Sequence, residues 1–544
     1  MGKRVLVLLS ASLALAFQAA QTAPFNDSIR KEEFRPEVFF LAGDFLQGRS
    51  TNTPGALIAA EYIKTRYESI GLKPAGDSGT YFQSFNMMTA TLGEPNSLEI
   101  VQPGAATLRL KPTQDYYPLD SSASGTARAE VVYVGFGITM ADLGYDDYRG
   151  KNVGGKIVLA LTGEPGENDP KSPFDGVVRS EGSNVLRKAL WAQEHGAIGI
   201  MFVQNVNNQP GPGNFEATAQ RYWPAQPPRV PRLTLSAWAD KVRIPAIEVS
   251  PALGAVLIRG TKRSLEEMSK SAETAAGFDP LPVPGVEVAI TANVQRHTIT
   301  ARNVLGAVEG SDPKLKDEYI IVSGHLDHVS PDGTQVFPGA DDNVTGTVAT
   351  IKIAEAFMRA AKAGQRPRRS LLFAVWEAEE RGLLGAWAYT EEPFWPLDKA
   401  VAILNMDLIG RNEEVPEGGG ARFRGLAVQT SESNKNTINI LGTARCPELK
   451  TASEKANKPF GLGLLFRYDN NVSNLMRRSD QWPFINHGVP GLWFLTGLHP
   501  DYHTVNDRPE KIDYAKMERV TRLVHQMTWD LAQEPSRPKL LPRK

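Results

Sequence analysis

The sequence predicts an α/β protein with a central, largely parallel sheet and a separate strand-rich unit. After about residue 290, short β-branched runs alternate with helical stretches, which is typical of parallel strands joined by helices. Between residues 126 and 258 the pattern changes to short strand-like runs broken by Gly, Pro and Asp, with one helix-like segment among them. A length of 544 residues suits two or three domains rather than one.

Composition narrows the classes of protein that fit this sequence. Apolar residues make up 41% and charged residues 22%, as in a globular protein. Lys and Arg number 60 against 61 Asp and Glu, which argues against a nucleic-acid partner or an anionic membrane surface. Because Cys446 is the only cysteine, the fold must stand without an internal disulfide.

The first residues are predicted to be a signal peptide, residues 1–24. Lys3 and Arg4 precede an apolar run of roughly 16 residues, and small residues follow at 19–23. An uncleaved anchor is the alternative, but the run is short for a membrane span. We therefore expect an exported protein, periplasmic or secreted, with no stable membrane anchor after the signal is removed. The oligomeric state stays open.

The rest of the chain divides into three segments. Helical periodicity covers residues 36–49 and 54–76, and the second of these stretches has Pro54 near its start and Gly71 near its end. The predicted boundaries are 25–125 for the first part of the main domain, 126–258 for the strand-rich unit, and 259–544 for the second part of the main domain.

Ligand-type residues follow each strand-like run of the last segment. Parallel strands bring such residues to one edge of the sheet, where active sites of α/β proteins gather. The clusters, in chain order, are His325, Asp327 and His328; Asp341 and Asp342; Glu377, Glu379 and Glu380; Asp407; and His499, Asp501, Tyr502 and His503.

So many carboxylates in one place repel one another unless cations neutralise them. Two divalent ions carry four positive charges, which three carboxylates and one hydroxide balance, with two neutral imidazoles completing the ligand set. Mixed imidazole and carboxylate ligands suit zinc best, with cobalt or manganese as substitutes. The sequence thus predicts two Zn²⁺ ions per chain.

The ordered motifs GHLDH, PGADDN, EAEERGLLG, NMDLIGR and DYHTVND resemble those of the co-catalytic di-zinc metallopeptidase family that includes bacterial leucyl aminopeptidases and glutamate carboxypeptidase. LAGDFLQGRSTNTPG and LKPAG resemble that family's opening. The unit at 126–258 resembles the protease-associated (PA) domain inserted in many members. The resemblance implies a three-layer zinc-exopeptidase fold with a mixed, largely parallel sheet, and a peptide substrate.

The resemblance also implies a role for each matching residue. His325 and Asp407 would bind one zinc and Glu380 with His503 the other, while Asp341 would bridge the two ions and be joined to Asp342 by a cis peptide bond. Glu379 would be the general base. Asp327 would accept the outer N–H of His325, and Tyr502 would hydrogen-bond the scissile carbonyl oxygen.

Several neighbouring residues keep two interpretations. His328 is either a packing histidine or a functional one, whereas His499 fits a structural role better. Asp342 fits a helix N-terminus that supports the site, and Glu377 fits a solvated or Arg-paired carboxylate. Asp507 either orients His503 or caps a turn.

The function implied is that of an exopeptidase, and most simply an aminopeptidase. A carboxypeptidase remains open, because Arg411, Arg467, Arg477 and Arg478 could hold a terminal carboxylate. A glutaminyl cyclase, which uses one zinc, and a binding platform that has lost its metals fit less well, since no ligand position is missing.

Overall fold

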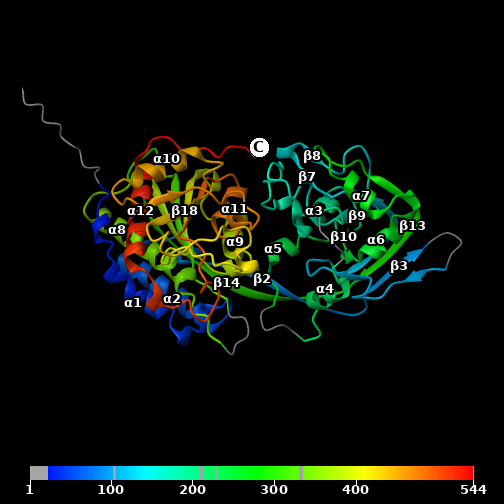
Figure 1. Ribbon diagram of the computed structural model, residues 1–544, viewed down its shortest axis with the longest axis horizontal. Coiled ribbons are helices and arrows are strands. Elements are labelled where there is room, and N and C mark those ends of the chain that lie inside the picture. The colour runs from blue at the N-terminus through cyan, green and yellow to red at the C-terminus, as the bar shows by residue number, and fades with distance from the viewer. Residues whose placement is uncertain (1–21, 102–105, 209–212, 227–230, 330–334, 543–544) are drawn as a thin grey trace, which may run out of the picture.

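The protein forms two lobes that are joined by a pair of long strands. A computed structural model describes residues 22–101, 106–208, 213–226, 231–329 and 335–542. Strands β2 (Phe82–Leu92) and β14 (Val294–Val308) pair in antiparallel register over their length and run from one lobe toward the other (Figure 1). We call residues 22–92 and 294–542 the main lobe, and residues 97–292 the second lobe.

The main lobe is built on a ten-stranded mixed sheet in the order β11-β2-β14-β16-β15-β17-β20-β18-β19, with β1 paired to β14. Its centre, β16-β15-β17-β20, is parallel and fully buried, so these strands are continuous apolar runs. The predicted α/β class with a largely parallel centre is confirmed. The remaining strands are β1 (Lys73–Pro74), β11 (Thr234–Leu235), β15 (Tyr319–His325), β16 (Ser370–Trp376), β17 (Ala400–Met406), β18 (Thr437–Leu441), β19 (Gly463–Leu465) and β20 (Gly491–Leu495).

Helices cover both faces of this sheet, which gives three layers. The first face packs against α1 (Lys31–Leu41), α2 (Pro54–Ile70), α8 (Gly346–Lys362), α10 (Pro447–Ala456) and α12 (Tyr514–Gln533), and the second against α9 (Leu384–Glu391) and α11 (Gln481–Asn486).

Local sequence explains where α2 begins and ends. The Thr53 side chain accepts a hydrogen bond from the Ala56 N–H, and Pro54 occupies the first turn, where its missing N–H removes no helical bond. Gly71 follows the helix with φ at 87°, a conformation that suits glycine. The predicted Pro-to-Gly limits of this helix are confirmed.

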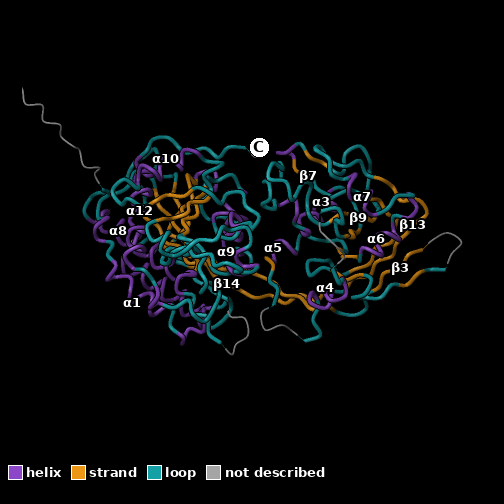
Figure 2. The backbone as a smooth tube through the Cα atoms, viewed as in Figure 1, coloured by secondary structure: helices purple, strands orange, loops and turns teal. Residues whose placement is uncertain are grey.

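The second lobe has an eight-stranded sheet in the order β4-β3-β13-β6-β9-β10-β12-β5, in which β6, β9, β10 and β12 are parallel. Strands and helices are both present in this lobe (Figure 2). This sheet is wider than the predicted unit at 126–258, since β3, β4 and β5 precede that range and β13 follows it. The likeness of this lobe to a PA domain stays a prediction. The strands of this sheet are β3 (Ser97–Val101), β4 (Leu108–Arg109), β5 (Tyr116–Pro118), β6 (Gly125–Tyr133), β9 (Ile157–Leu161), β10 (Gly199–Val203), β12 (Ala246–Val249) and β13 (Leu281–Ala292). Strands β7 (Thr139–Met140) and β8 (Tyr145–Asp146) form a separate two-stranded sheet.

Among its described residues, the second lobe also has the α-helices α3 (Val185–Glu194), α4 (Phe215–Tyr222), α5 (Ser236–Ala239), α6 (Pro251–Leu257) and α7 (Leu265–Ser271). Strand β11 and α5 belong to this stretch of chain but contact β2 of the main lobe. Most of the predicted signal peptide, residues 1–21, lies outside the described residues. Within the described ranges, no helix combines the length and apolar character needed to cross a membrane.

Candidate metal centre

The predicted ligand residues converge at one edge of the main sheet. His325 is the last residue of β15, Asp407 directly follows β17, and Glu380 lies in the turn after β16. His503 comes from the loop after β20, and Asp342 from the turn that leads into α8. The carboxyl ends of four parallel strands therefore position this site, as the sequence predicts.

These residues form two groups able to hold a metal ion. In each group one nitrogen or oxygen atom from every residue lies within 4.8 Å of the others. The first group is His328, Asp342, Glu380 and His503, and the second is His325, Asp342 and Asp407. Because Asp342 belongs to both, the two groups are the two halves of one centre.

The atoms that face each other are close but are not satisfied by one another. His325 Nε2 lies 3.4 Å from both Asp342 Oδ1 and Asp407 Oδ1, and His503 Nε2 lies 2.9 Å from Asp342 Oδ2. Nevertheless His325 Nε2, His503 Nε2 and Asp407 Oδ1 make no well-oriented hydrogen bond with any described residue. Buried polar atoms are normally hydrogen-bonded, so this arrangement fits lone pairs directed at a shared cation.

Asp342, rather than the predicted Asp341, is the carboxylate shared by the two groups. Asp341 faces away: its Oδ1 accepts hydrogen bonds from the Gly410 N–H at 2.6 Å and the Thr345 hydroxyl at 3.1 Å. Its Oδ2 lies 3.3 Å from His499 Nε2. Consecutive residues in this turn point in different directions, and the cis peptide bond likewise lies between Asp342 and Asn343, one residue later than predicted. We therefore transfer the bridging role to Asp342.

His328 belongs to the first group. Of its two interpretations, a packing histidine or a functional one, the structure therefore favours the second. Its Nδ1 lies 2.9 Å from Glu380 Oε1, and burial lowers the pKa of His328 to about 4. A neutral imidazole is the form that binds a metal. The sequence signal that could have identified His328 as a site residue is its H-x-x-H spacing from His325.

Asp327 holds the site together in a different way from the one predicted. His325 Nδ1 is 3.1 Å from the backbone oxygen of Asp327, while the nearer carboxylate oxygen is 3.8 Å away. The carboxylate instead accepts hydrogen bonds from the N–H groups of Glu379 at 3.0 Å and Glu380 at 3.3 Å. Asp327 therefore fixes the turn that carries Glu379 and Glu380, because its two oxygens occupy that turn's amides.

Glu379 lies beside the two groups without belonging to either, as a general base should. Its Oε2 is 3.7 Å from His325 Nε2. Burial raises the pKa of Glu379 well above its usual value, and the charges of Glu380 and Asp407 raise it further against the opposing effect of His325. Burial and the charge of Glu380 also raise the pKa of Asp342. The cluster is thus short of positive charge, a deficit that bound cations would remove.

The groups open into a cavity of about 510 Å³, which we call the metal pocket. Glu379, Tyr502 and His503 line it together with three arginines, Arg422, Arg477 and Arg478. The Tyr502 ring packs against His503 with centroids 3.9 Å apart, so the phenol lies next to the centre. The donor set of imidazoles and carboxylates fits divalent zinc.

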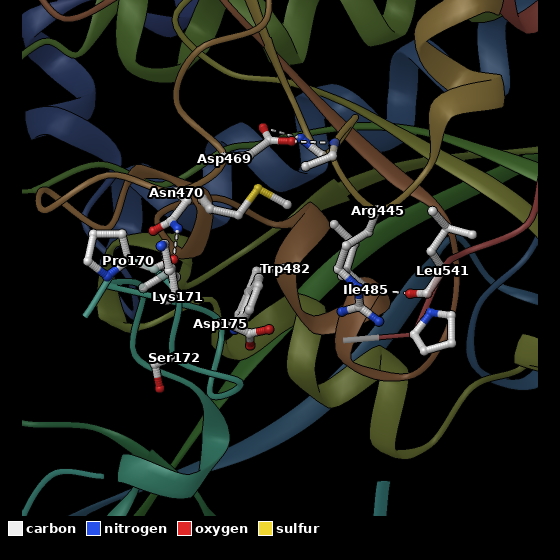
Figure 3. Close-up of a pocket in the computed structure, with 16 residues that line it drawn as sticks. Pro170, Lys171, Ser172, Asp175, Arg445, Asp469, Asn470, Trp482, Ile485 and Leu541 are labelled. Atoms are coloured by element: carbon white, nitrogen blue, oxygen red, sulfur yellow. Dashed lines mark hydrogen bonds between the residues drawn. The ribbon is translucent and has the colours of Figure 1, made fainter. Parts of the chain in front are cut away.

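A second cavity of about 510 Å³ lies where the two lobes meet (Figure 3). Trp482 and Ile485 of the main lobe line it opposite Asp175 of the second lobe, and Leu541 closes one side. The described residues that line this cavity include no histidine and no member of the two ligand groups. It is therefore separate from the metal centre.

The fold and the site together define an α/β protein with a buried His, Asp and Glu centre for divalent metal. Residues 303–528, which carry every residue of both ligand groups, match Peptidase family M28. This part of the chain is therefore similar to that peptidase family, in agreement with the family resemblance of its motifs.

Relatives bear two kinds of name. The chain is 29% identical over 321 residues to a probable glutamate carboxypeptidase of Arthroderma benhamiae, covering 53% of this chain and 40% of that one. It is 28% identical over 375 residues to aminopeptidase NAALADL1 of Mus musculus, covering 61% of this chain and 44% of that one. The chain spans about half the length of the curated relatives it matches.

Among solved structures, the aminopeptidase from Aneurinibacillus sp. strain AM-1 is similar over 96% of this chain and 97% of that one, with 19% identity and a TM-score of 0.47.

Proposed function

We propose that the protein is an exported, zinc-dependent exopeptidase that removes residues from the amino end of peptides. The observation that carries this proposal is the pair of ligand groups sharing Asp342, with Glu379 beside them at the wall of the metal pocket. A shared carboxylate with a separate glutamate is the arrangement of two-metal hydrolases.

Two zinc ions would be held by His325, Asp342 and Asp407 on one side and by His328, Asp342, Glu380 and His503 on the other. When bound, they would polarise the scissile carbonyl and lower the pKa of a water molecule. Glu379 would take the proton of that water and pass it to the departing amine, which its raised pKa favours. Tyr502 would donate a hydrogen bond to the oxygen of the scissile carbonyl.

Cleavage at the amino end is supported by the carboxylates that line the metal pocket. A free amine is a cation, and the negative charge of Glu379 and Glu380 at the pocket wall would favour it there. Aminopeptidase NAALADL1 is among the relatives.

Cleavage at the carboxyl end is the second candidate, and the arginines favour it. Of the four arginines that the sequence suggested, Arg477 and Arg478 line the metal pocket, joined there by Arg422. Arg411 and Arg467 pair instead with Asp501 at 3.0 Å and with Glu413. Several relatives are named probable glutamate carboxypeptidases.

The second lobe would restrict which peptides enter. Arg477, which lines the metal pocket, pairs with Glu181 of the second lobe at 3.3 Å and donates to the backbone oxygen of Arg179. Asn470 donates to the Pro170 oxygen at 2.9 Å nearby. A lobe held against the pocket wall in this way supports selection of short or flexible peptides.

The test is digestion of an unblocked mixed-sequence pentapeptide by the purified chain with added zinc, followed by mass spectrometry. Loss of residues from the amino end is the expected result. Loss from the carboxyl end would replace the first candidate by the second. An untouched peptide, with two zinc ions bound per chain, would contradict general exopeptidase activity.

A further inference from the structure

Arg49 is a fully buried arginine that hydrogen-bonds only backbone oxygens among the described residues. Its side chain is 1% exposed, and its Nε donates to the Leu326 oxygen at 2.8 Å. Nη1 donates to the Pro338 oxygen at 2.8 Å and the Leu41 oxygen at 2.6 Å, and Nη2 to the Gly339 oxygen at 3.0 Å. The planar fork of a guanidinium can serve several carbonyls at once, which a lysine ammonium does less well.

Asp507 is a fully buried aspartate that binds the same turn from its amide side. Its Oδ1 accepts from the Asp341 N–H at 3.0 Å, and its Oδ2 from the Asp342 N–H at 3.1 Å. Its backbone oxygen accepts from the Ala340 N–H at 3.1 Å. The alternative in which Asp507 orients His503 has no contact to support it among the described residues.

Arg49 and Asp507 together hold five consecutive residues, four through their side chains and Ala340 through the backbone oxygen of Asp507. Arg49 takes the carbonyls of residues 338 and 339, and Asp507 takes the amides of residues 340, 341 and 342. The last of these is Asp342, the carboxylate that belongs to both ligand groups. A carboxylate whose own backbone amide is hydrogen-bonded has little freedom to move, because the four residues before it are also held by hydrogen bonds.

The same two residues also connect the turn to the other ligand segments. Leu326, which accepts from Arg49, directly follows His325 in the chain. Asp507 lies four residues after His503. Arg49 thus connects the turn of Asp342 to the segment of His325, and Asp507 connects it to the segment of His503.

We propose that Arg49 and Asp507 are positioning residues that clamp residues 338–342 and place Asp342 for both metal ions before either ion binds. The proposal rests on the metal centre of the proposed function. Neither residue touches substrate or metal in this role. Because Asp342 is shared, loosening the clamp weakens both sites together, whereas the loss of one ligand weakens mainly its own site.

The test is zinc titration of the full-length, metal-free protein by calorimetry, with variants Arg49→Lys and Asp507→Asn. Lysine offers a single ammonium in place of the fork, and the amide of asparagine presents N–H groups to one of the two backbone donors. We expect at least tenfold weaker zinc binding at both sites, as for other residues that orient ligands. When Co²⁺ replaces Zn²⁺, the visible absorption spectrum of each variant should also differ from that of the wild type. This spectrum reports ligand geometry independently of turnover.

Matched controls separate the clamp from a general loss of stability. Arg369 is equally buried and donates to the backbone oxygen of Leu531 at 2.8 Å, and Asp469 accepts from the Gly442 N–H at 2.8 Å. Arg369→Lys and Asp469→Asn should lower the melting temperature of the metal-free protein by at least as much as the clamp variants, yet leave zinc affinity and the cobalt spectrum unchanged.

Three outcomes would overturn the proposal. Clamp variants that bind zinc as tightly as the wild type would refute the clamp alone. Equal loss of affinity in the controls would show that stability, rather than positioning, is responsible. A wild-type chain that binds no zinc would refute the metal centre itself, and with it the proposed function. If a clamp variant does not fold, the other variant decides, since either half of the clamp suffices for the test.

Discussion

The two lobes both bury charged side chains near the ends of parallel strands, but the hydrogen-bond partners of those side chains differ. In the second lobe, the Lys188 ammonium donates to the backbone oxygens of Leu161 and Gly163. Asp147 accepts from the N–H groups of Ile138 at 3.0 Å and Phe278 at 2.6 Å. For these two side chains, backbone groups satisfy the buried charge.

In the main lobe the buried histidines and carboxylates surround a shared space and leave several atoms without hydrogen bonds. Leaving such groups unsatisfied destabilises a fold, so they persist where a ligand completes them. The difference teaches that burial of charge alone does not identify a functional site. The distinguishing feature is a set of unsatisfied atoms that converge on one point.

The largest effect should come from removing the base at that point. Glu379→Gln should lower kcat about 1,000-fold on the peptide that the chain cleaves, since proton transfer then lacks its acceptor. Zinc content, measured by inductively coupled plasma mass spectrometry, should remain that of the wild type.

Glu377→Gln is the matched control for this change. Glu377 lies two residues away and is equally buried, but its Oε2 accepts from the Arg302 N–H at 2.8 Å. Its kcat should fall less than tenfold. Similar losses in the two variants would remove the distinction between a carboxylate beside the ligand groups and one that is bound to backbone N–H groups.

The second effect concerns the two neighbouring aspartates. Asp342→Asn should weaken zinc binding about 100-fold and reduce the bound stoichiometry below two, because the shared ligand is lost. Asp341→Asn should retain two ions and lower only the melting temperature, since Asp341 contacts Gly410 and Thr345 instead. Calorimetric titration of both variants checks this, and a reversed order would restore Asp341 as the bridge.

A smaller effect is expected from a satisfied charge in the second lobe. Glu164 accepts hydrogen bonds from the Ser180 N–H, at 2.7 Å, and from its hydroxyl. Glu164→Gln turns a donor toward Ser180 and should lower the free energy of unfolding by about 1–3 kcal/mol. Zinc affinity should not change, and urea unfolding together with zinc titration measures both quantities. A loss of zinc affinity would mean that the lobes are coupled through Ser180 and Arg477.

The smallest effect is a pH dependence from one buried histidine. Burial lowers the pKa of His525 to about 3, whereas an unfolded histidine titrates near 6.5. Between those values the unfolded state binds a proton that the folded state does not. The free energy of unfolding should therefore fall as pH falls, by roughly 1 kcal/mol per pH unit.

Denaturant unfolding of the metal-free protein at pH 7, 6 and 5 measures this slope. His525→Leu should flatten it, while His297→Leu, at an exposed position, should not. An unchanged slope in His525→Leu would assign the acid sensitivity to other groups.

Much of the fold and of the site could be predicted from local sequence. The strand-like runs before His325 and Asp407 and the Pro54-to-Gly71 helix are local patterns, and they form as predicted. The family motifs pointed to His325, Glu380, Asp407 and His503, and each of these residues lies in one of the two groups able to hold a metal ion.

The remaining features depend on side-chain orientations and on contacts between residues far apart in the sequence, which a motif does not contain. Asp341 and Asp342 are identical side chains one residue apart, and only the turn decides which one faces the pocket. Arg49 and Asp507 lie more than 450 residues apart in the sequence, so their common turn is visible only once the chain has folded.

The register between β2 and β14 has a consequence for the modularity of the chain. Leu92 pairs with Val294, so the chain leaves the main sheet and re-enters it at adjacent positions. A short hairpin turn joining these two residues would bypass the entire second lobe without changing the order of the main sheet beyond the loss of β11. The second lobe is thus an insertion in a β-hairpin, and exchanging it for a different module would leave the strands that carry the two ligand groups unchanged.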